Sequence, residues 1–360
     1  MPHGHPPHGL PPSILVYRPI TPDHPQKGSN THMTGKIVTV FGGSGFLGRH
    51  VVRALCKQGW RVRVATRRPH LAGDVKLAGD VGQVQLVQAN VRNRASIKRA
   101  LENADAAINL VGILSERGSQ NFNGTQSLGA TNIAQLAAEA GIANYVLVSA
   151  IGADVKSKSN YARTKAEAEA ATREAIPSSV ILRPSILFGP EDGFFTRFAL
   201  MARFTPVLPL IGGSTKFQPI YVGDVAHAIA NALKPQHAGK TFELGGPRAY
   251  TMKELLQYIT RTIDRPRMLL PIPIPVAAPM GYIVGALSKL NPFFGPPITG
   301  DQVQLLKLDN VVAPGANTIA DLGITSLESV EAITPTYLWR HRPHGQFQPP
   351  HVDEASRVDA

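Results

Sequence analysis

The sequence predicts an α/β fold with a doubly wound parallel sheet, helices on both faces and a smaller cap region towards the C-terminus. From residue 36 onward, short apolar segments of strand length alternate with longer segments of helical periodicity. A glycine-rich turn joins the first strand segment to the first helix segment. The chain has 360 residues, 43% hydrophobic and 17% charged, which suits one large or two modest globular domains. Alternation of this kind indicates a parallel sheet covered on both sides.

The elements follow one another in a regular order through the first two hundred residues. We expect strands at 36–41, 60–66, 83–88, 105–111, 144–149 and 178–183. We expect helices at 46–58, 94–102, 122–141, 159–175 and 193–204. The next part is less regular, and we expect a helix at 223–234, a strand at 240–245 and a helix at 251–263 to form the cap.

The turn at residues 42–48 has the spacing G-x-x-G-x-x-G, with glycines at 42, 45 and 48. The first glycine permits a tight turn, the second lets the backbone approach a pyrophosphate, and the third lets helix and strand pack closely. The N-terminus of the following helix offers free N–H groups to phosphates. This predicts a Rossmann-type dinucleotide site that includes Gly42, Ser44, Gly45, Phe46, Leu47 and Gly48.

The second strand ends in Thr66-Arg67-Arg68, where a site that prefers NAD has an acidic residue for the ribose 2′-hydroxyl. Guanidinium groups suit a 2′-phosphate, so the sequence favours NADP(H). The alternative is that both arginines are solvated loop charges. The ends of the third and fourth strands add four more candidates, because ligands bind at such ends in open α/β sheets. These candidates are Asn90, Val91, Val111 and Gly112.

Tyr161 and Lys165 stand one turn apart on a predicted helix and face the same side. In this arrangement the lysine holds the nicotinamide ribose and lowers the pKa of the tyrosine, which passes a proton during hydride transfer. Y-x-x-x-K also occurs by chance on helices. We assign both residues to the cofactor site, with a catalytic role that is either retained or vestigial.

The order of these motifs and of the segment 182–190 resembles the extended and atypical short-chain dehydrogenase/reductases. Later segments resemble one branch, the nucleotide-binding accessory subunits of respiratory complex I, the NADH–ubiquinone oxidoreductase alpha subcomplex subunit 9 family. The segments that carry this resemblance are 190–195, 218–225, 245–250, 270–275 and 339–342.

The resemblance implies a tightly held NADPH that is structural, with Pro184 also in the cofactor site. It implies docking on complex I subunits near the quinone site, in peripheral contact with the membrane or membrane arm. The location would be the cytoplasmic face of a bacterial inner membrane or the matrix face of the mitochondrial inner membrane. We accordingly expect a nucleotide domain over 35–190 and an interleaved cap and docking region over 191–345. Two tails would flank these regions. Residues 1–34, rich in Pro and His, would be disordered, and residues 346–360 would be flexible.

One departure from the family pattern concerns the residues after the fifth strand. Active enzymes carry two hydroxyl residues there, whereas this chain has Ser149-Ala150. In that register Ala150 occupies the catalytic position, and a slip of one residue would restore Ser149. The alternatives are therefore an accessory or assembly subunit, a working reductase, dehydrogenase or epimerase acting on an apolar or quinone-like carbonyl, or a redox-sensing regulator.

The formal net charge of +12 favours an anionic membrane surface or a large complex over nucleic acid, because no nucleic-acid-binding signature accompanies it. We predict no metal site, since the sequence holds no Cys/His cluster with ligand spacing. The apolar segment 268–298 is interrupted by prolines and does not predict a spanning helix. It is either a buried subdomain or a docking surface with Ile283, Leu287, Phe293 and Phe294 as anchors. The start of the chain, Met1 or Met33, stays open.

Overall fold

The computed structural model describes residues 35–116, 118, 120–277, 279 and 299–347. Its main element is a seven-stranded sheet in the order β11-β6-β5-β4-β1-β2-β3, in which every neighbouring pair is parallel. The strands are β1 (Ile37–Phe41), β2 (Arg61–Thr66), β3 (Val84–Gln88), β4 (Ala106–Asn109), β5 (Asn144–Val148), β6 (Val180–Pro184) and β11 (Thr241–Leu244). The strand order reverses between β1 and β4, which is where open α/β sheets bind ligands.

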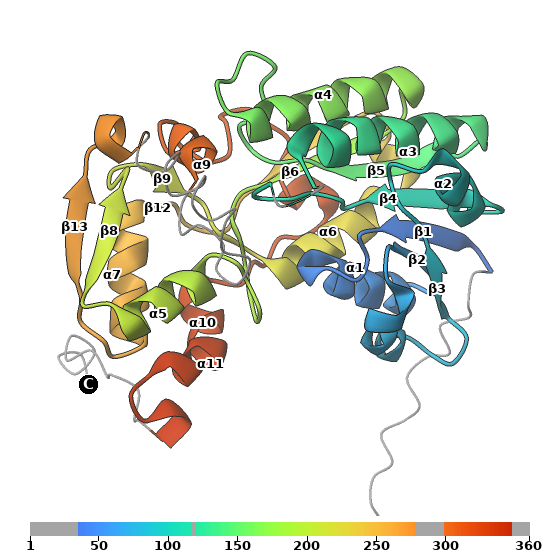
Figure 1. The fold of residues 1–360 in the computed structure, drawn as a ribbon. Coiled ribbons are helices and arrows are strands. Elements are labelled where there is room, and N and C mark those ends of the chain that lie inside the picture. The colour runs from blue at the N-terminus through green and yellow to red at the C-terminus, as the bar shows by residue number, and fades with distance from the viewer. Residues whose placement is uncertain (1–34, 117, 119, 278, 280–298, 348–360) are drawn as a thin grey trace, which may run out of the picture. The chain divides into compact units, whose positions relative to one another are not determined.

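Helices cover both faces of this sheet (Figure 1). One face carries α2 (Arg94–Leu101), α3 (Leu128–Glu139) and α4 (Asn160–Ala175), and the other carries α1 (Phe46–Lys57) and α6 (Val222–Ala232). Two buried apolar clusters fill the layers, because alternate strand residues face opposite sides of the sheet. A single π-helical turn, η3 (Asn123–Ser127), precedes α3. The predicted doubly wound α/β fold is confirmed, with each predicted strand and helix of residues 36–204 present within a few residues of its expected bounds, except that 122–141 divides into η3 and α3.

The prediction that three elements of residues 223–263 form a smaller cap beside the nucleotide domain is wrong for two of them. The predicted strand at 240–245 is β11, which pairs with β6 and extends the main sheet. The predicted helix at 223–234 is α6, whose Val225 and Ile229 are buried in the same cluster as Val51 and Leu55 of α1. The prediction thus placed α6 and β11 in the wrong part of the fold, because periodicity does not show which surface covers an apolar face. The third, α7 (Met252–Thr262), does lie outside the sheet.

The C-terminal part consists of shorter elements around a third buried cluster. Among its described residues the longest helices are α5 (Phe195–Phe204) and α7, beside the parallel pair β8 (Val207–Ile211) and β13 (Met268–Ile272). The shorter helices are α9 (Gly300–Leu305), α10 (Val330–Ile333) and α11 (Pro335–Leu338). Two-residue strands are β7 (Leu187–Phe188), β9 (Lys216–Phe217), β10 (Ile220–Tyr221) and β12 (Tyr250–Thr251). Short 3₁₀ turns lie between β2 and β3, at Pro69–Leu71 and Gly73–Ala78, and later in the chain at Pro235–His237, Ala320–Leu322, Trp339–His341 and Gly345–Phe347.

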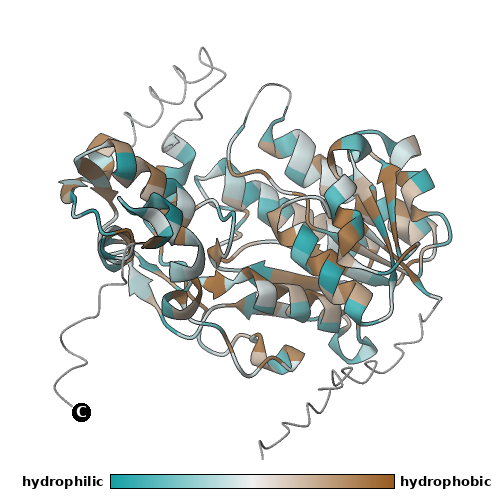
Figure 2. Cartoon of the chain, turned by 90° about the horizontal axis from the view of Figure 1, so that it is seen from below, coloured by the Kyte–Doolittle hydropathy of each residue, from teal (hydrophilic) through white to brown (hydrophobic). Residues whose placement is uncertain are grey.

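Coloured by hydropathy, the strands of the main sheet are hydrophobic, whereas the helices that cover it carry many hydrophilic positions (Figure 2). The apolar run at 268–272 is strand β13, in which Met268 and Leu270 are exposed. Several predicted features lie outside the described residues: the tail over 1–34, residues 348–360 of the C-terminal tail, and the anchors Ile283, Leu287, Phe293 and Phe294. In the part of the chain that is described, no helix combines the length and apolarity that a membrane crossing requires.

Candidate dinucleotide-binding site

The glycine turn between β1 and α1 has the geometry that its spacing predicts. Gly42 has φ +83°, a left-handed conformation that favours glycine, and its carbonyl accepts a hydrogen bond from the Gly45 N–H at 3.0 Å. A Cβ on Gly48 would lie 2.3 Å from the Gly42 oxygen and 2.6 Å from the Gly43 Cα. The third glycine therefore lets the helix pack against the turn itself, not against the strand as the sequence predicted. Gly45 is exposed and has open space apart from the Gly42 oxygen at 3.3 Å.

The N-terminus of α1 is suited to an anion. Gly45 is the N-cap and supplies no side chain to cap the helix, and the first turn contains no acidic residue. The N–H groups and the positive end of the helix dipole are thus not neutralised by the helix's own side chains. A phosphate at this point would find donors and favourable charge.

A cleft of about 330 Å³ opens in front of this turn, at the carboxyl ends of β1 to β4. Its walls include most of the predicted cofactor residues: Gly42, Ser44, Gly45, Phe46, Leu47, Gly48, Arg67, Asn90, Val91, Val111 and Gly112. The sequence missed the other lining residues, which are Phe41, Ala65, Thr66, Ala89, Arg92, Leu110, Ile113, Gln120 and Thr125. Most of these adjoin a predicted residue at a strand end, so the position of the strand end was the signal that could have found them.

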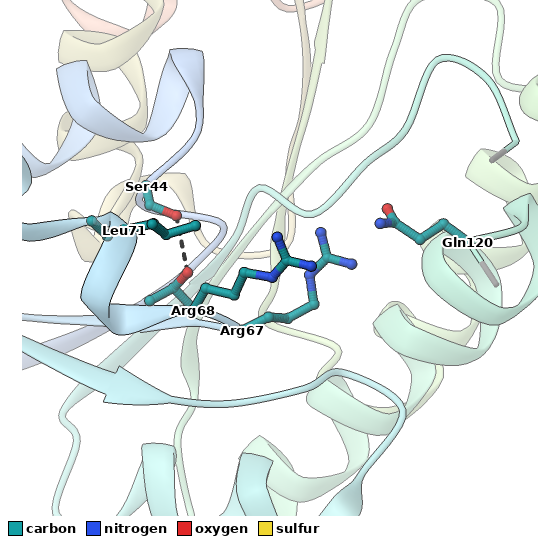
Figure 3. A pocket seen from close by; sticks show the side chains of 7 residues that line it. Ser44, Arg67, Arg68, Leu71 and Gln120 are labelled. Carbon is teal, nitrogen blue, oxygen red and sulfur yellow. Dashed lines mark hydrogen bonds between the residues drawn. The ribbon is translucent and has the colours of Figure 1, made fainter. Parts of the chain in front are cut away.

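Beside the cleft, a smaller pocket of about 240 Å³ is lined by Ser44, Thr66, Arg67, Arg68, Leu71, Ala72 and Gln120. Arg67 and Arg68 extend in the same direction from the end of β2, and Gln120 enters from the opposite wall (Figure 3). With its amide oxygen turned towards Arg67, Gln120 accepts from one guanidinium nitrogen at 2.7 Å and from the other at 3.3 Å. The Ser44 hydroxyl donates to Thr66 Oγ1 at 3.1 Å across the base of the pocket. Gln120 belongs to no motif, and only the tertiary fold brings it to Arg67.

Tyr161 and Lys165 lie beyond the residues that line the cleft, but Lys165 comes close to its edge. A Cβ on Gly112 would lie 3.2 Å from Lys165 Nζ. The ammonium group donates to the Val148 carbonyl at 3.1 Å, and burial lowers the pKa of Lys165 to about 8. Burial, followed by the Asp301 carboxylate, raises the pKa of Tyr161 to about 12. This is opposite to the lowering that the Y-x-x-x-K spacing predicts. Lys165 Nζ lies 6.0 Å from the centroid of the Tyr161 ring and donates to the Val148 carbonyl.

Ser149 and Pro184 lie at the ends of the neighbouring strands β5 and β6, and both are buried. The Ser149 hydroxyl has no hydrogen-bond partner, whereas its N–H donates to the Leu182 carbonyl at 2.7 Å. An unpartnered buried hydroxyl next to Val148 is a group that a ligand could satisfy. Ala150, which follows, has no side-chain hydrogen-bonding group.

Comparison with known proteins agrees with this geometry. The family model described as "NAD dependent epimerase/dehydratase family" matches residues 38–245. The chain is 38% identical over 307 residues to NADH dehydrogenase [ubiquinone] 1 alpha subcomplex subunit 9, mitochondrial, of Arabidopsis thaliana, covering 82% of this chain and 76% of that protein. It is 32% identical over 257 residues to the ceramide reductase of Caulobacter vibrioides, covering 71% and 79%. Among solved structures, that of gox2253 superposes with a TM-score of 0.65 at 18% identity, over 87% of this chain and all of the other, which is a likeness of fold.

The fold and the nucleotide cleft therefore define a protein of the NAD-dependent epimerase/dehydratase family, a class of nicotinamide-nucleotide-binding proteins. Within that class, the chain belongs to the alpha subcomplex subunit 9 family of NADH dehydrogenase.

Proposed function

We propose that this chain binds NADP(H) and acts as an accessory or assembly subunit of respiratory complex I, the NADH:quinone oxidoreductase, in which the nucleotide has a structural role. The observation that carries the nucleotide assignment is the arginine-lined pocket beside the glycine cleft. Nucleotide binding would use residues 35–190, and docking would use the region 191–345.

The preference for NADP(H) over NAD(H) is supported by the charge at the end of β2. Thr66 is followed by Arg67 and Arg68, both exposed to the pocket side, and no carboxylate lines this pocket. An NAD site needs an acceptor for the 2′-hydroxyl, and a 2′-phosphate needs donors. The two guanidinium groups provide donors in a planar fork that matches phosphate oxygens. Gln120 holds Arg67 in place from the opposite wall.

A structural role for the nucleotide is supported by the state of the groups that a reductase would use. The raised pKa of Tyr161 disfavours its release of a proton at neutral pH, and Lys165 is bound to the Val148 carbonyl. In the register without a slip, Ala150 would occupy the position of the second hydroxyl of active enzymes. Tyr161 and Lys165 would then hold the nicotinamide ribose. The nicotinamide would supply hydride chemistry only if a substrate could reach it.

Assembly with complex I is supported by the fact that similar proteins are named as subunits of NADH dehydrogenase. Similarity to the Arabidopsis subunit extends over 82% of the chain, beyond the nucleotide half and into the docking region. The expected partners are complex I subunits near the quinone site, in peripheral contact with the membrane arm. We propose a location on the cytoplasmic face of a bacterial inner membrane or on the matrix face of a mitochondrial inner membrane.

Two measurements on the untagged protein test this proposal. Membranes are solubilised and complex I is resolved on a native gel, and the same band is analysed for this chain and for released nucleotide. We expect the chain to migrate with complex I and to release NADP(H). Migration apart from the complex, or release of NAD(H) alone, would contradict the corresponding half of the proposal.

A second candidate function is NADPH-dependent reduction of an apolar carbonyl. It is favoured by the 32% identity to a ceramide reductase and by the presence of both Tyr161 and Lys165. Purified protein is incubated with NADPH and with apolar carbonyl or quinone substrates, and NADPH absorbance is followed. Turnover that Tyr161→Phe abolishes would favour the enzyme, and a constant absorbance would favour the accessory subunit.

A further inference from the structure

A carboxylate of the C-terminal part is hydrogen-bonded to the start of the helix that carries Tyr161 and Lys165. Asp301 lies in the first turn of α9 and is 142 positions beyond Ser159 in sequence. One carboxylate oxygen accepts from the Asn160 N–H at 2.6 Å. The other accepts from the Tyr161 N–H at 3.3 Å and from the Ser159 hydroxyl at 2.9 Å.

These contacts complete the N-terminus of α4. Ser159 is its N-cap, and the Ser159 Oγ accepts from the Ala162 N–H at 3.3 Å. The first three N–H groups of the helix, which have no acceptor within the helix, are therefore all satisfied, two of them by Asp301. A carboxylate at this position also interacts favourably with the helix dipole. Asp301 thus contacts the first turn of α4 at the residue that carries the Tyr161 side chain.

The same short helix contacts the loop after β4, directly beside residues that line the cleft. Gln302, next to Asp301, donates from its amide nitrogen to the Leu114 carbonyl at 3.3 Å. Leu114 directly follows Val111, Gly112 and Ile113, which line the cleft. Helix α9 therefore bridges the loop after β4 and the start of α4, the two segments between which Lys165 meets Gly112.

We propose that Asp301 is a positioning residue for the nucleotide site: through α9 it fixes α4 relative to the loop after β4, so that docking of α9 and binding of the nucleotide stabilise each other. The inference rests on the proposed binding of NADP(H). Because such coupling is reciprocal, bound nucleotide should also hold α9 more firmly.

A role limited to capping would have a different consequence. Loss of a cap lowers the stability of the free and the bound protein equally, so the affinity for the nucleotide does not change. A positioning role lowers the affinity, because the site must be reordered each time the nucleotide binds.

The test uses the full chain with three variants: Asp301→Ala, Asp301→Asn and the control Asp309→Ala. Asn keeps one carbonyl oxygen that can accept from the Asn160 N–H. Asp309 lies in the same C-terminal segment and accepts from the Lys216 N–H at 2.8 Å, away from α4. NADPH affinity is measured by calorimetry, and hydrogen exchange is measured at 112–116, 159–163 and 300–305 with and without NADPH.

We expect Asp301→Ala to weaken NADPH binding about tenfold, a difference of about 1.4 kcal/mol, with Asp301→Asn intermediate and Asp309→Ala unchanged. NADPH should slow exchange at 300–305 in the unaltered protein, and Asp301→Ala should remove that protection. If Asp301→Ala does not fold, the same comparison is made with Asp301→Asn. Unchanged affinity in a folded Asp301 variant, while the unaltered protein binds NADPH, would overturn the positioning role alone. Absence of NADPH binding by the unaltered protein would overturn the proposed function as well.

Discussion

The nucleotide half and the C-terminal part of this protein place their polar groups in different ways. In the nucleotide half, most of the groups that line the cleft lie within a few residues of the end of β1, β2, β3 or β4, and Gln120 and Thr125 are the exceptions. In the C-terminal part, polar contacts join residues far apart in sequence. The Tyr337 hydroxyl donates to Asp192 across 145 positions, and the Tyr250 hydroxyl donates to Glu331 across 81.

The difference shows where sequence motifs carry information. A parallel sheet brings the carboxyl ends of its strands to one edge, so a residue that follows a strand is already placed. A short helix such as α9 has no comparable rule, and its site of contact depends on the packing of the whole chain. The residues that bind ligands at the strand ends can therefore be predicted from local sequence. The residues of the C-terminal part that hold other elements in place cannot.

The largest loss of stability is expected at Gly48, where the turn and helix α1 are in closest contact. In Gly48→Ala the added Cβ would meet the backbone of Gly42 and Gly43 at 2.3–2.6 Å, so α1 must move away from the turn. We expect a loss of about 3 kcal/mol in the free energy of unfolding, near the upper end for overpacking. Urea denaturation followed by circular dichroism measures it. A variant as stable as the unaltered protein would show that the turn and helix are not tightly joined.

Gly45→Val, at the second glycine of the turn, should impair nucleotide binding without impairing folding. Apart from the Gly42 oxygen at 3.3 Å, the space beside Gly45 is open, so the fold should survive. The side chain would enter the cleft where the pyrophosphate is expected to approach. We expect the variant to lose the NADPH-induced rise in melting temperature that the unaltered protein shows. Thermal unfolding with and without NADPH provides the measurement, and a normal rise would place the phosphates elsewhere.

A smaller effect is expected from Lys165→Met, and it depends on pH. The folded-state pKa of Lys165 is about 8, below the ordinary 10.5, so between these values the unfolded chain binds more protons. The Lys165 contribution to stability is therefore unfavourable below pH 8 and recovers as pH rises towards 10.5. Relative to the unaltered protein, Lys165→Met should be most stable near pH 7 and lose much of that advantage by pH 9.5. Urea midpoints at both pH values measure it, and a constant difference would contradict the lowered pKa.

Much of the nucleotide half could be predicted from the sequence because its signals are local. The G-x-x-G-x-x-G spacing, the apolar strands and the absence of an acid after β2 each act over a few residues. Gln120 was missed because it lies in a loop without a motif and meets Arg67 only in the folded chain. The direction of the Tyr161 pKa shift was missed because burial and Asp301 both arise from tertiary packing.

The C-terminal part could be predicted only in outline. Helix α7 could be predicted because its signals are local, and the structure adds a capping box of Thr251 with Glu254 within the same segment. The assignment of β11 to the cap failed because strand pairing is non-local, and that of α6 failed because periodicity does not show which surface covers an apolar face. Two-residue strands such as β7 and β10 carry too little periodicity to be recognised.

The most direct test of the central claim is a comparison of NADPH and NADH binding before and after Arg67 and Arg68 are replaced by Ala. Calorimetry is performed on the unaltered protein and on the double variant, with circular dichroism as the check on folding. We predict tighter binding of NADPH than NADH by the unaltered protein. In the double variant, NADPH affinity should fall by roughly 1.5–3 kcal/mol for each phosphate contact that is lost, with little change for NADH. An equal loss for both nucleotides, or equal affinities from the outset, would contradict the account.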